Sequence, residues 1–458
     1  MRRAAGLLAL VSFALCGACT RSRPGLPPRN ILIVTFDGLR ADHLSCYGHA
    51  RPSSALPSGE QERLEDRAFA LDDLAAGGIT FARAFAPSPR TLPSLATLFT
   101  GQSPSATGVL DDRSRLPREL PTLAELARAA GFQTAAFVSR ADLDLLAAVG
   151  RGFDDAHACA SDSEALARAR GWLAQDFGDE RRRLVWIHLS GLEPPWAPIP
   201  SAELLRPECA PLRFLDPDYH GPADGSAACF ARVASGAPAL EPADRAALAE
   251  LYDGRIAAVA GRFTGFLEDA FDYNRRGAEA SEFWARTLLV VTATHGLDLG
   301  LRGDGLRAEL QDDLLRVPLI LHHPDSLPGA RVLEPVVELA DVLPTLVELC
   351  GLPRPRDLPG RSLLGTLAPR SAVTQSAQGV FSVSDGRWRM IWNPYIANMA
   401  PGDPRRGQPI VALYENGADR DSAGAHPELV ARLQQSVVEW IARQHFRPSL
   451  PLVPGRSP

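Results

Sequence analysis

The stretch NILIVTFDGLRADHLSCYG, residues 30–48, decides the fold expected of this chain. Residues 31–36 are apolar apart from one threonine and lack polar alternation, which is typical of a strand buried on both faces of a sheet. Asp37 follows this strand directly. Ligands of open α/β sheets gather at the carboxyl ends of the strands, so the stretch also predicts a functional carboxylate at that edge.

Similar apolar runs recur along the chain, at residues 134–138, 184–189, 288–292 and 319–321. Leucines and alanines at helical spacing lie between them, at 122–130 and 244–270. This alternation predicts an α/β fold, a three-layer sandwich around a large and mostly parallel sheet. After residue 371, the tract FSVSDGRWRMIWNP predicts antiparallel strands, and residues 426–444 predict a closing helix. Together they would form a smaller C-terminal α+β subdomain.

A second stretch, APSPRTLPSLATLFTG at residues 86–101, resembles the nucleophile loop of the sulfatases, a branch of the alkaline phosphatase superfamily. The family pattern is C-x-P-S-R, followed by L-x-T-G, and its Cys or Ser is oxidised to formylglycine. Thr91 stands at the Cys position and Leu95 at the Arg position, while the rest of the pattern is kept. The resemblance runs from about residue 30 to about residue 440, through RTLLVVTATHG (286–296), LRVPLIL (315–321), ADVLPTLVELCGLP (340–353) and GRSLL (360–364).

The resemblance implies a bound divalent cation, which is calcium in the family. Its ligands come from the end of the first strand, from the nucleophile and from a pair after a late strand. Asp37, Thr91 and His295 match these positions, whereas Gly38 replaces an acidic neighbour and Thr294 replaces the Asp of the pair. Zinc or manganese would suit a nucleophilic Thr91, as in the resembling phosphoethanolamine transferases. The alternative is that the chain binds no metal.

Further departures fall on the groups that hold the ester and protonate the leaving group. Gly191 stands at an Asp of the family pattern, Glu193 at the catalytic His, and Arg302 at the His of G-E-H-G. The resemblance thus predicts no formylglycine and weak or absent hydrolysis, with a binding or structural role retained. The alternative is an active ester hydrolase or transferase that uses Thr91 as nucleophile. Asp298, Asp304 or Glu193 could take over a vacant ligand position.

Simpler structural roles are also open for several of these residues. Asp37 could belong to a loop hydrogen-bond network, and Thr91 could cap a helix that begins at about Pro93. Two tempting pairs are expected to be structural, namely His322 with His323 and Asp312 with Asp313. The loop hydrogen-bond network suggested for Asp37 would also contain Arg40, Asp42 and His43.

The N-terminus predicts export. Arg2 and Arg3 precede an apolar run at 4–15 that is too short to span a membrane, and LCGAC resembles a lipoprotein cleavage site ending at Cys19. We expect a signal peptide at 1–19, lipidation of Cys19 and a tether at 20–29; ordinary secretion is the alternative. The sulfatase-like domain is predicted at 30–370 with an insertion at about 198–238, the C-terminal subdomain at 371–446 and a tail at 447–458.

Composition fits an exported envelope protein, periplasmic or on the cell surface. The 458 residues carry a net charge of −6, so there is no basic footprint for nucleic acid, and all 48 basic residues are arginines. The expected partners are the membrane, through the lipid anchor, and a sulfate ester, phosphate ester or glycan. Cys209 and Cys229 could close a loop in an oxidising compartment, whereas Cys46 and Cys350 are expected to be buried, inert thiols.

Overall fold

The computed structural model describes most of the chain between residues 27 and 444. The described ranges are 27–50, 71–139, 144–175, 181–196, 223–235, 240–271, 277–300, 310–324, 326–356, 358–394, 409–416, 418 and 420–444. Several predictions lie outside them, namely the signal peptide, Cys19, most of the tether, Cys209, Arg302, Asp304, most of the 198–238 insertion and the tail. Among the described helices, none is long and apolar enough to cross a membrane.

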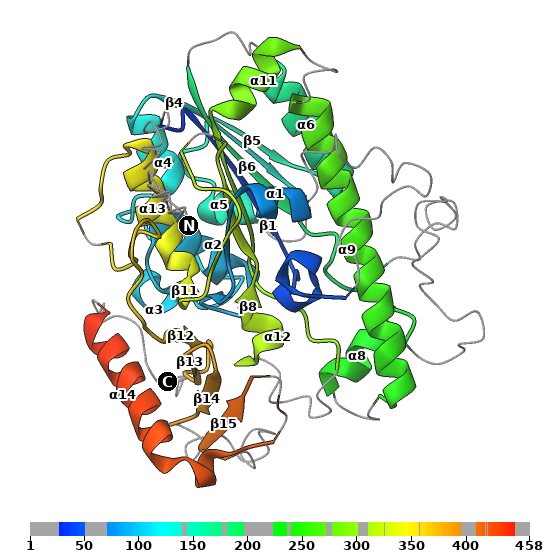
Figure 1. Ribbon diagram of the computed structural model, residues 1–458, viewed down its shortest axis with the longest axis vertical. Coiled ribbons are helices and arrows are strands. Elements are labelled where there is room, and N and C mark those ends of the chain that lie inside the picture. Colours follow the sequence, from blue (N-terminus) through cyan, green and yellow to red (C-terminus); the bar gives the residue numbers. More distant parts are fainter. Residues whose placement is uncertain are drawn as a thin grey trace, which may run out of the picture.

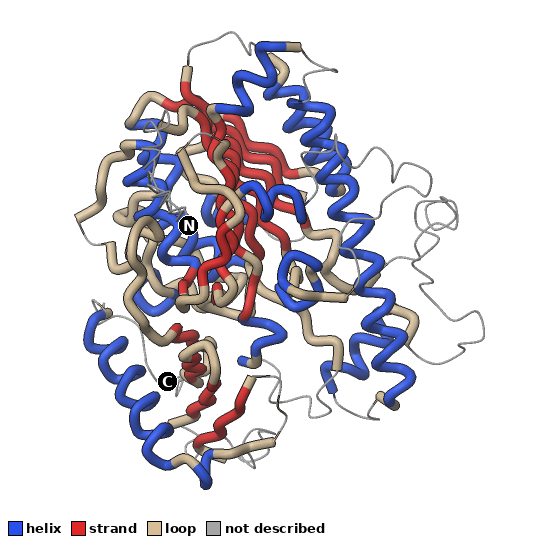
Figure 2. The backbone as a smooth tube through the Cα atoms, viewed as in Figure 1, coloured by secondary structure: helices blue, strands red, loops and turns tan. Residues whose placement is uncertain are grey.

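An eight-stranded sheet forms the centre of the molecule, in the order β10-β2-β9-β7-β1-β6-β4-β5 (Figures 1 and 2). Its strands are β1 Asn30–Phe36, β2 Ile79–Phe81, β4 Phe132–Val138, β5 Asp155–Ala158, β6 Arg182–Leu189, β7 Thr287–Ala293, β9 Leu319–His322 and β10 Arg331–Leu333. All five apolar runs predicted as strands lie within this set.

One strand runs opposite to the expectation of a parallel arrangement. β9 pairs antiparallel with both of its neighbours, β7 and β2, whereas the other pairings of the sheet are parallel. A strand buried on both faces has the same apolar composition in either direction, so its sequence does not reveal its orientation. The sheet is nevertheless mostly parallel, as predicted.

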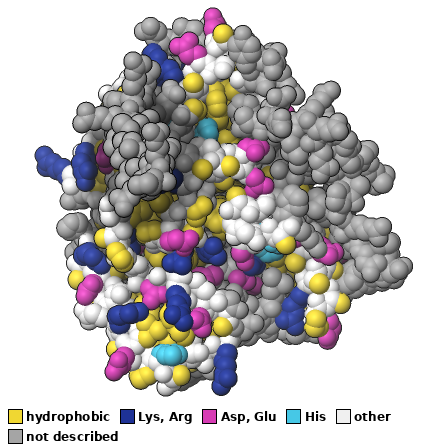
Figure 3. Space-filling view, viewed as in Figure 1, with side chains coloured by type: hydrophobic (Ala, Val, Ile, Leu, Met, Phe, Trp, Pro, Cys, Tyr) yellow, Lys and Arg dark blue, Asp and Glu magenta, His cyan; other side chains and the backbone are white. Residues whose placement is uncertain are grey.

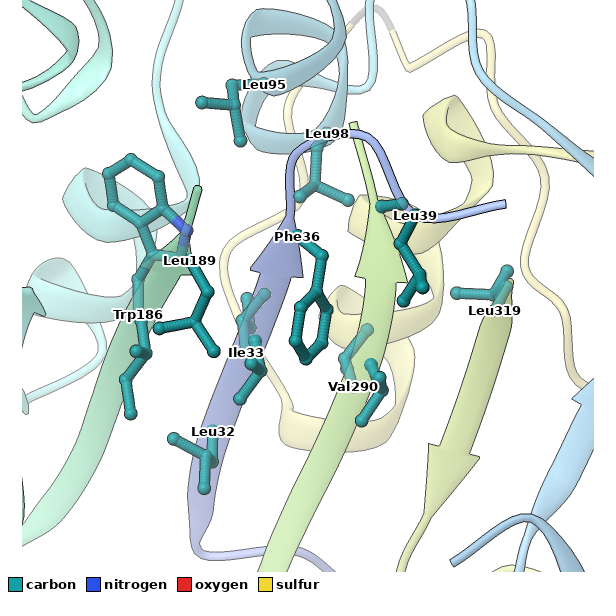
Figure 4. Packing of buried hydrophobic residues seen from close by; sticks show 14 of the residues in the cluster. Leu32, Ile33, Phe36, Leu39, Leu95, Leu98, Trp186, Leu189, Val290 and Leu319 are labelled. Atoms are coloured by element: carbon teal, nitrogen blue, oxygen red, sulfur yellow. The ribbon is translucent and has the colours of Figure 1, made fainter. Parts of the chain in front are cut away.

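β1 lies in the middle of the sheet, between β6 and β7. All seven of its residues are buried. Figure 4 shows Ile33 of β1 between Trp186 of β6 and Val290 of β7, and Phe36 beside Leu189 of β6, as the strand register requires. This central position brings the carboxyl end of β1 next to the ends of both neighbouring strands.

Helices cover both faces of the sheet and complete the three layers (Figures 1 and 2). One face carries α2 Thr91–Thr100, α4 Leu123–Ala129, α5 Leu145–Val149 and α13 Val342–Cys350. The other carries α6 Asp162–Leu173, α9 Pro242–Phe271 and α11 Ala278–Ala285. The helices predicted at 122–130 and 244–270 are confirmed as α4 and α9. A capping box between Thr122 and Glu125 starts α4, because each side chain accepts a backbone N–H of the other residue.

The C-terminal part has its own antiparallel sheet, formed by β12 Ala372–Gln375, β13 Phe381–Ser384, β14 Trp388–Trp392 and β15 Val411–Glu415. Helix α14, Pro427–Arg443, packs on this sheet through Leu433 and Val437. The predicted antiparallel strands and closing helix are thus both present. On the face shown in Figure 3, arginines and acidic side chains are interspersed over this lower part, in line with ion pairs such as that of Arg432 with Asp385.

The remaining elements are short. They are α1 Leu71–Gly77, α3 Pro104–Thr107, α8 Ala227–Ser235, α12 Asp312–Leu315, the strands β3 Ala84–Phe85, β8 Arg316–Val317 and β11 Val337–Glu338, and the 3-10 turns η1 Ala41–His43, η2 Ser45–Tyr47, η6 Leu339–Asp341 and η9 Ala423–Ala425. Two of these turns, η1 and η2, form the loop after β1, and this loop lies beside α9 (Figure 1).

Candidate functional site

The ends of β1 and β7 bring together the polar residues that the sequence placed at strand ends. Phe36 pairs with Ala293 in the parallel register, so Asp37 and Thr294 leave the sheet side by side. The Thr294 hydroxyl donates a hydrogen bond to Asp37 Oδ1, and its backbone N–H donates to Phe36 O at 2.9 Å. Asp37 is completely buried, so its carboxylate depends on such donors for stability.

Thr91 reaches the same carboxylate from the start of α2. Its Oγ1 donates to Asp37 Oδ1 at 3.0 Å and lies 3.3 Å from His295 Nε2. The idea that Thr91 caps a helix beginning near Pro93 is wrong, because α2 begins at Thr91 itself with Arg90 at the N-cap. The Thr91 side chain turns into the site instead of back onto the helix. The structure thus gathers Asp37, Thr91 and His295, the three residues predicted as metal ligands.

His295 presents a defined ring nitrogen to Thr91. Its Nδ1 lies 2.8 Å from the carbonyl oxygen of Gly296, and a carbonyl can only accept, so Nδ1 carries a hydrogen. In the neutral ring, Nε2 then carries the lone pair, which can bind a cation or accept the Thr91 proton. Either role would use the atom that faces the hydroxyl.

His188 is a member of the site that was not predicted from the sequence. Its Nε2 lies 3.2 Å from Asp37 Oδ2, and its Nδ1 lies 2.9 Å from the hydroxyl of Thr35, which also accepts a hydrogen bond from Trp186 Nε1. The available signal was an imidazole inside an otherwise apolar buried strand, because a fully buried polar ring requires partners. His188 therefore contacts the second carboxylate oxygen of Asp37, while Thr91 and Thr294 contact the first.

Glu193 brings a second carboxylate to the site. Its Oε1 lies 3.7 Å from His295 Nε2. Gly38 has φ +73°, and a β-carbon at this position would lie 3.1 Å from Glu193 Oε1. The Glu193 carboxylate therefore faces the place where the family pattern has its second acid. Of the three alternative ligands, Glu193 lies next to His295. Asp298 accepts a hydrogen bond from the backbone N–H of Gly300 at 2.8 Å. Asp304 lies outside the described residues.

Gly191 and Leu95 also differ from the family pattern, and the packing around both positions leaves no room for a charged side chain. The Gly191 N–H donates to Asp162 Oδ2 at 3.1 Å, and a β-carbon on Gly191 would lie 2.3 Å from that oxygen, so Asp162 occupies the space of a side chain there. Leu95 is fully buried beside Leu98 in the core under α2 (Figure 4). Neither position offers a charged group to an ester anion.

The neighbouring loop contains ion pairs centred on Arg40. Arg40 pairs with Asp42 at 2.8 Å and with Asp313 at 3.2 Å. Burial acts to lower the pKa of Arg40, but the Asp313 and Asp42 carboxylates outweigh it and raise that pKa. Burial acts to raise the pKa of Asp42, but the hydrogen bond and charge of Arg40 outweigh it and lower that pKa.

The two tempting pairs have structural contacts, as expected. Asp312 begins α12 and pairs with Arg389. His322 stacks on Trp284 with ring centroids 5.5 Å apart. Burial, aided by the charge of His323, lowers the pKa of His322 to about 4, so this imidazole is neutral at physiological pH.

The cysteines differ in their burial. Cys350 is buried as expected, whereas Cys46 is only partly buried. Burial raises the pKa of each thiol to about 12, so neither is a reactive thiolate. Cys229 is also buried, and its suggested partner Cys209 lies outside the described residues.

The donor atoms of the site fit a divalent cation in kind and spacing. Ligands about 2.0 Å from a tetrahedral zinc lie about 3.3 Å from one another. Asp37 Oδ1, Thr91 Oγ1 and His295 Nε2 are separated by 3.0, 3.3 and 3.9 Å. Asp37, Thr91 and His295 would hold such an ion.

The first part of the chain matches a known family. The sulfatase family model matches residues 29–191. This range contains Asp37, Thr91 and His188 of the site, whereas Glu193 and His295 lie beyond it. The matched part therefore includes β1, the loop after it and residues 86–101.

Comparisons with individual proteins agree with this match. Human arylsulfatase A is 37% identical over 113 residues, which are 23% of this chain and 20% of that protein, so the chain matches about a fifth of its length. The phosphonate monoester hydrolase of Agrobacterium radiobacter has a TM-score of 0.63 at 19% identity, covering 91% of this chain and 96% of that chain. A putative sulfatase from Bacteroides thetaiotaomicron has a TM-score of 0.65 at 16% identity, covering 92% and 93%.

At these identities the solved structures show the fold alone. The family model and the curated relatives support the match of this part of the chain to the sulfatases. Residues 29–191 of the chain thus match the sulfatase family, and the described fold is similar to that of solved sulfatase structures.

Proposed function

We propose that this chain uses the sulfatase scaffold for a binding or structural role at the bacterial cell envelope, with weak or no ester hydrolysis. The main support is the replacement of a carboxylate by the Thr294 hydroxyl, which donates to Asp37 Oδ1. Thr91 donates to the same oxygen at 3.0 Å. Hydroxyls bring no charge to a cation that prefers several charged oxygens, so a cation should bind more weakly here than at a site with more carboxylates.

The surrounding positions support the same proposal. Leu95 is buried in the core where the family has an arginine, and Gly191 has no room for a side chain because of Asp162. Glu193 stands where the family has its catalytic His, so the imidazole of the family is absent from that position. The chain would thus lack groups that orient the ester and protonate its leaving group.

The ligand that we propose is a sulfate ester, a phosphate ester or a glycan that carries one. Calorimetric titration of the purified mature chain with a sulfated glycan fragment tests this, with the desulfated fragment as control. Saturable binding of the sulfated form alone supports the proposal. Equal heats for the two fragments, or none, would remove this ligand class.

A second candidate function is favoured by one observation, the 3.3 Å separation of Thr91 Oγ1 from His295 Nε2. In this candidate mechanism the Thr91 hydroxyl turns its hydrogen from Asp37 to His295 and its oxygen attacks phosphorus or sulfur. His295 takes the proton and passes it to the ester oxygen, which leaves as the alcohol. A bound cation would supply charge to lower the pKa of the Thr91 hydroxyl. Trapping the chain with a phosphate ester and finding a phosphoryl group on Thr91 by mass spectrometry would favour this candidate.

No formylglycine is expected, because the precursor in the family is a Cys or Ser and this chain has Thr91 at that position. Mass spectrometry of the proteolytic peptide that spans residues 86–101 should show an unmodified threonine. A synthetic peptide with the aldehyde calibrates detection. A species with the mass of the aldehyde would contradict the prediction.

We also propose that the mature chain is anchored by lipid at Cys19, which follows a charged start and a short apolar run. The Cys19→Ala variant should appear in the soluble fraction, whereas the unchanged chain should sediment with membranes. The Cys16→Ala variant is the matched control and should behave like the unchanged chain. Identical membrane fractionation of Cys19→Ala would refute the anchor.

A further inference from the structure

A second cluster of metal-ligating side chains lies beside the candidate site, on the loop after β1 and on α9. It consists of His43, His49 and Asp253. Each of the three side chains offers one ligand atom, and these three atoms all lie within 4.8 Å of one another. Among the described residues, no other group of three His, Cys, Asp or Glu side chains meets this condition. Figure 1 shows the loop and α9 side by side.

The aspartate contacts both imidazoles. Asp253 Oδ1 lies 2.6 Å from His43 Nδ1, and Oδ2 lies 3.2 Å from His49 Nε2. The two rings are stacked, with centroids 5.0 Å apart. The His43 and Asp253 side chains are 9% and 8% exposed, while His49 is 22% exposed. The cluster is thus mostly shielded from water and open on the His49 side.

We propose that His43, His49 and Asp253 bind a divalent transition metal of the zinc type, separately from the candidate site. Two imidazole nitrogens and one carboxylate suit zinc, whereas calcium and magnesium prefer oxygen ligands. The 3.2 Å separation of His49 from Asp253 is near the distance of about 3.3 Å expected between ligands of tetrahedral zinc, whereas the 2.6 Å separation of His43 from Asp253 is that of a hydrogen bond and would have to lengthen. Small movements would open the site, and the exposed side of His49 gives an entry path.

The charges around the cluster are compatible with a cation. Arg40 is a nearby cationic side chain, and its charge is balanced by Asp42 and Asp313. The Arg40 charge, which would otherwise repel a metal ion, is therefore neutralised by the carboxylates of Asp42 and Asp313.

Contacts next to the cluster connect it to the loop that begins with Asp37. Tyr252, which precedes Asp253 on α9, accepts the Arg40 N–H at 2.9 Å and contacts His43 edge to face. Its hydroxyl donates to the carbonyl of Gly38. A metal held by the cluster would therefore tie α9 to this loop.

Zinc binding by the purified chain tests the proposal. Bound zinc is measured by elemental mass spectrometry and by the zinc-dependent rise in Tm. His49→Ala should weaken zinc binding at least about tenfold and remove the part of the Tm rise that this site contributes. His157→Ala is the matched control and should change nothing, because His157 pairs with Asp155 at 2.7 Å and, within the described residues, belongs to no group of three such ligands. His295→Ala should keep the zinc that depends on His49.

A second measurement avoids any folding defect of a variant. Diethyl pyrocarbonate should modify His49 in the unchanged chain, and zinc should block this modification while leaving that of His157 unaffected. Zinc binding that is the same in His49→Ala and in the unchanged chain would overturn the proposal. Modification of His49 at the same rate with and without zinc would also overturn the proposal, because a histidine that does not bind zinc is not protected by it.

Discussion

Replacing Gly296 with alanine is expected to destabilise the chain by at least about 3 kcal/mol. A β-carbon at this position would lie 1.9 Å from the carbonyl oxygen of Asp313, so the backbone would have to move. The Gly296 N–H also donates to Leu314 O at 2.8 Å, and its carbonyl accepts from His295 Nδ1. The displacement would therefore reach the candidate site. Denaturant unfolding followed by circular dichroism measures the loss.

Gly171→Ala is the matched control for this substitution. Gly171 lies within α6, and a β-carbon there meets nothing within 4 Å. Alanine has the higher helix propensity, so this variant should gain about 0.5–1 kcal/mol. Equal stability of the Gly296→Ala variant and the unchanged chain would mean that the loop after β7 does not pack closely against Asp313.

Replacing Thr294 with aspartate is expected to have opposite effects without and with a divalent metal. Thr294 donates to the buried Asp37, so a carboxylate in its place would set two like charges against each other and cost about 3 kcal/mol without metal. A cation between them would relieve the repulsion, so zinc or manganese affinity should rise at least about tenfold. Thermal unfolding with and without metal measures both effects.

Thr294→Val separates charge from the loss of a hydrogen bond. Valine keeps the shape of threonine but leaves Asp37 Oδ1 without one donor, which should cost about 1–3 kcal/mol with no gain in metal affinity. An unchanged metal affinity of Thr294→Asp would mean that positions 37 and 294 do not face a common cation, and the candidate metal site would be wrong.

The fold could be predicted because its main signals are local. Buried strands such as β1 are apolar along their whole length, and helix α4 carries its own capping box. The direction of β9 could not be predicted, because burial on both faces gives the same composition in either direction.

The candidate site was predictable only where a residue matched a family position. Asp37, Thr91 and His295 come together from three distant segments, as their positions in the family pattern implied. His188 was missed because its role depends on the register that sets it opposite Thr35. The proximity of Glu193 to His295 depends on the course of the loop after β6, which has no periodic signal.

The most direct test of the central claim is the turnover of a sulfate monoester and a phosphate diester by the purified mature chain. The assay is run with calcium, manganese or zinc, and in parallel with Thr91→Ala. Our account predicts that both proteins give the same rate as buffer with the same metal. Metal-dependent turnover by the unchanged chain that is lost in Thr91→Ala would contradict it and establish Thr91 as the nucleophile.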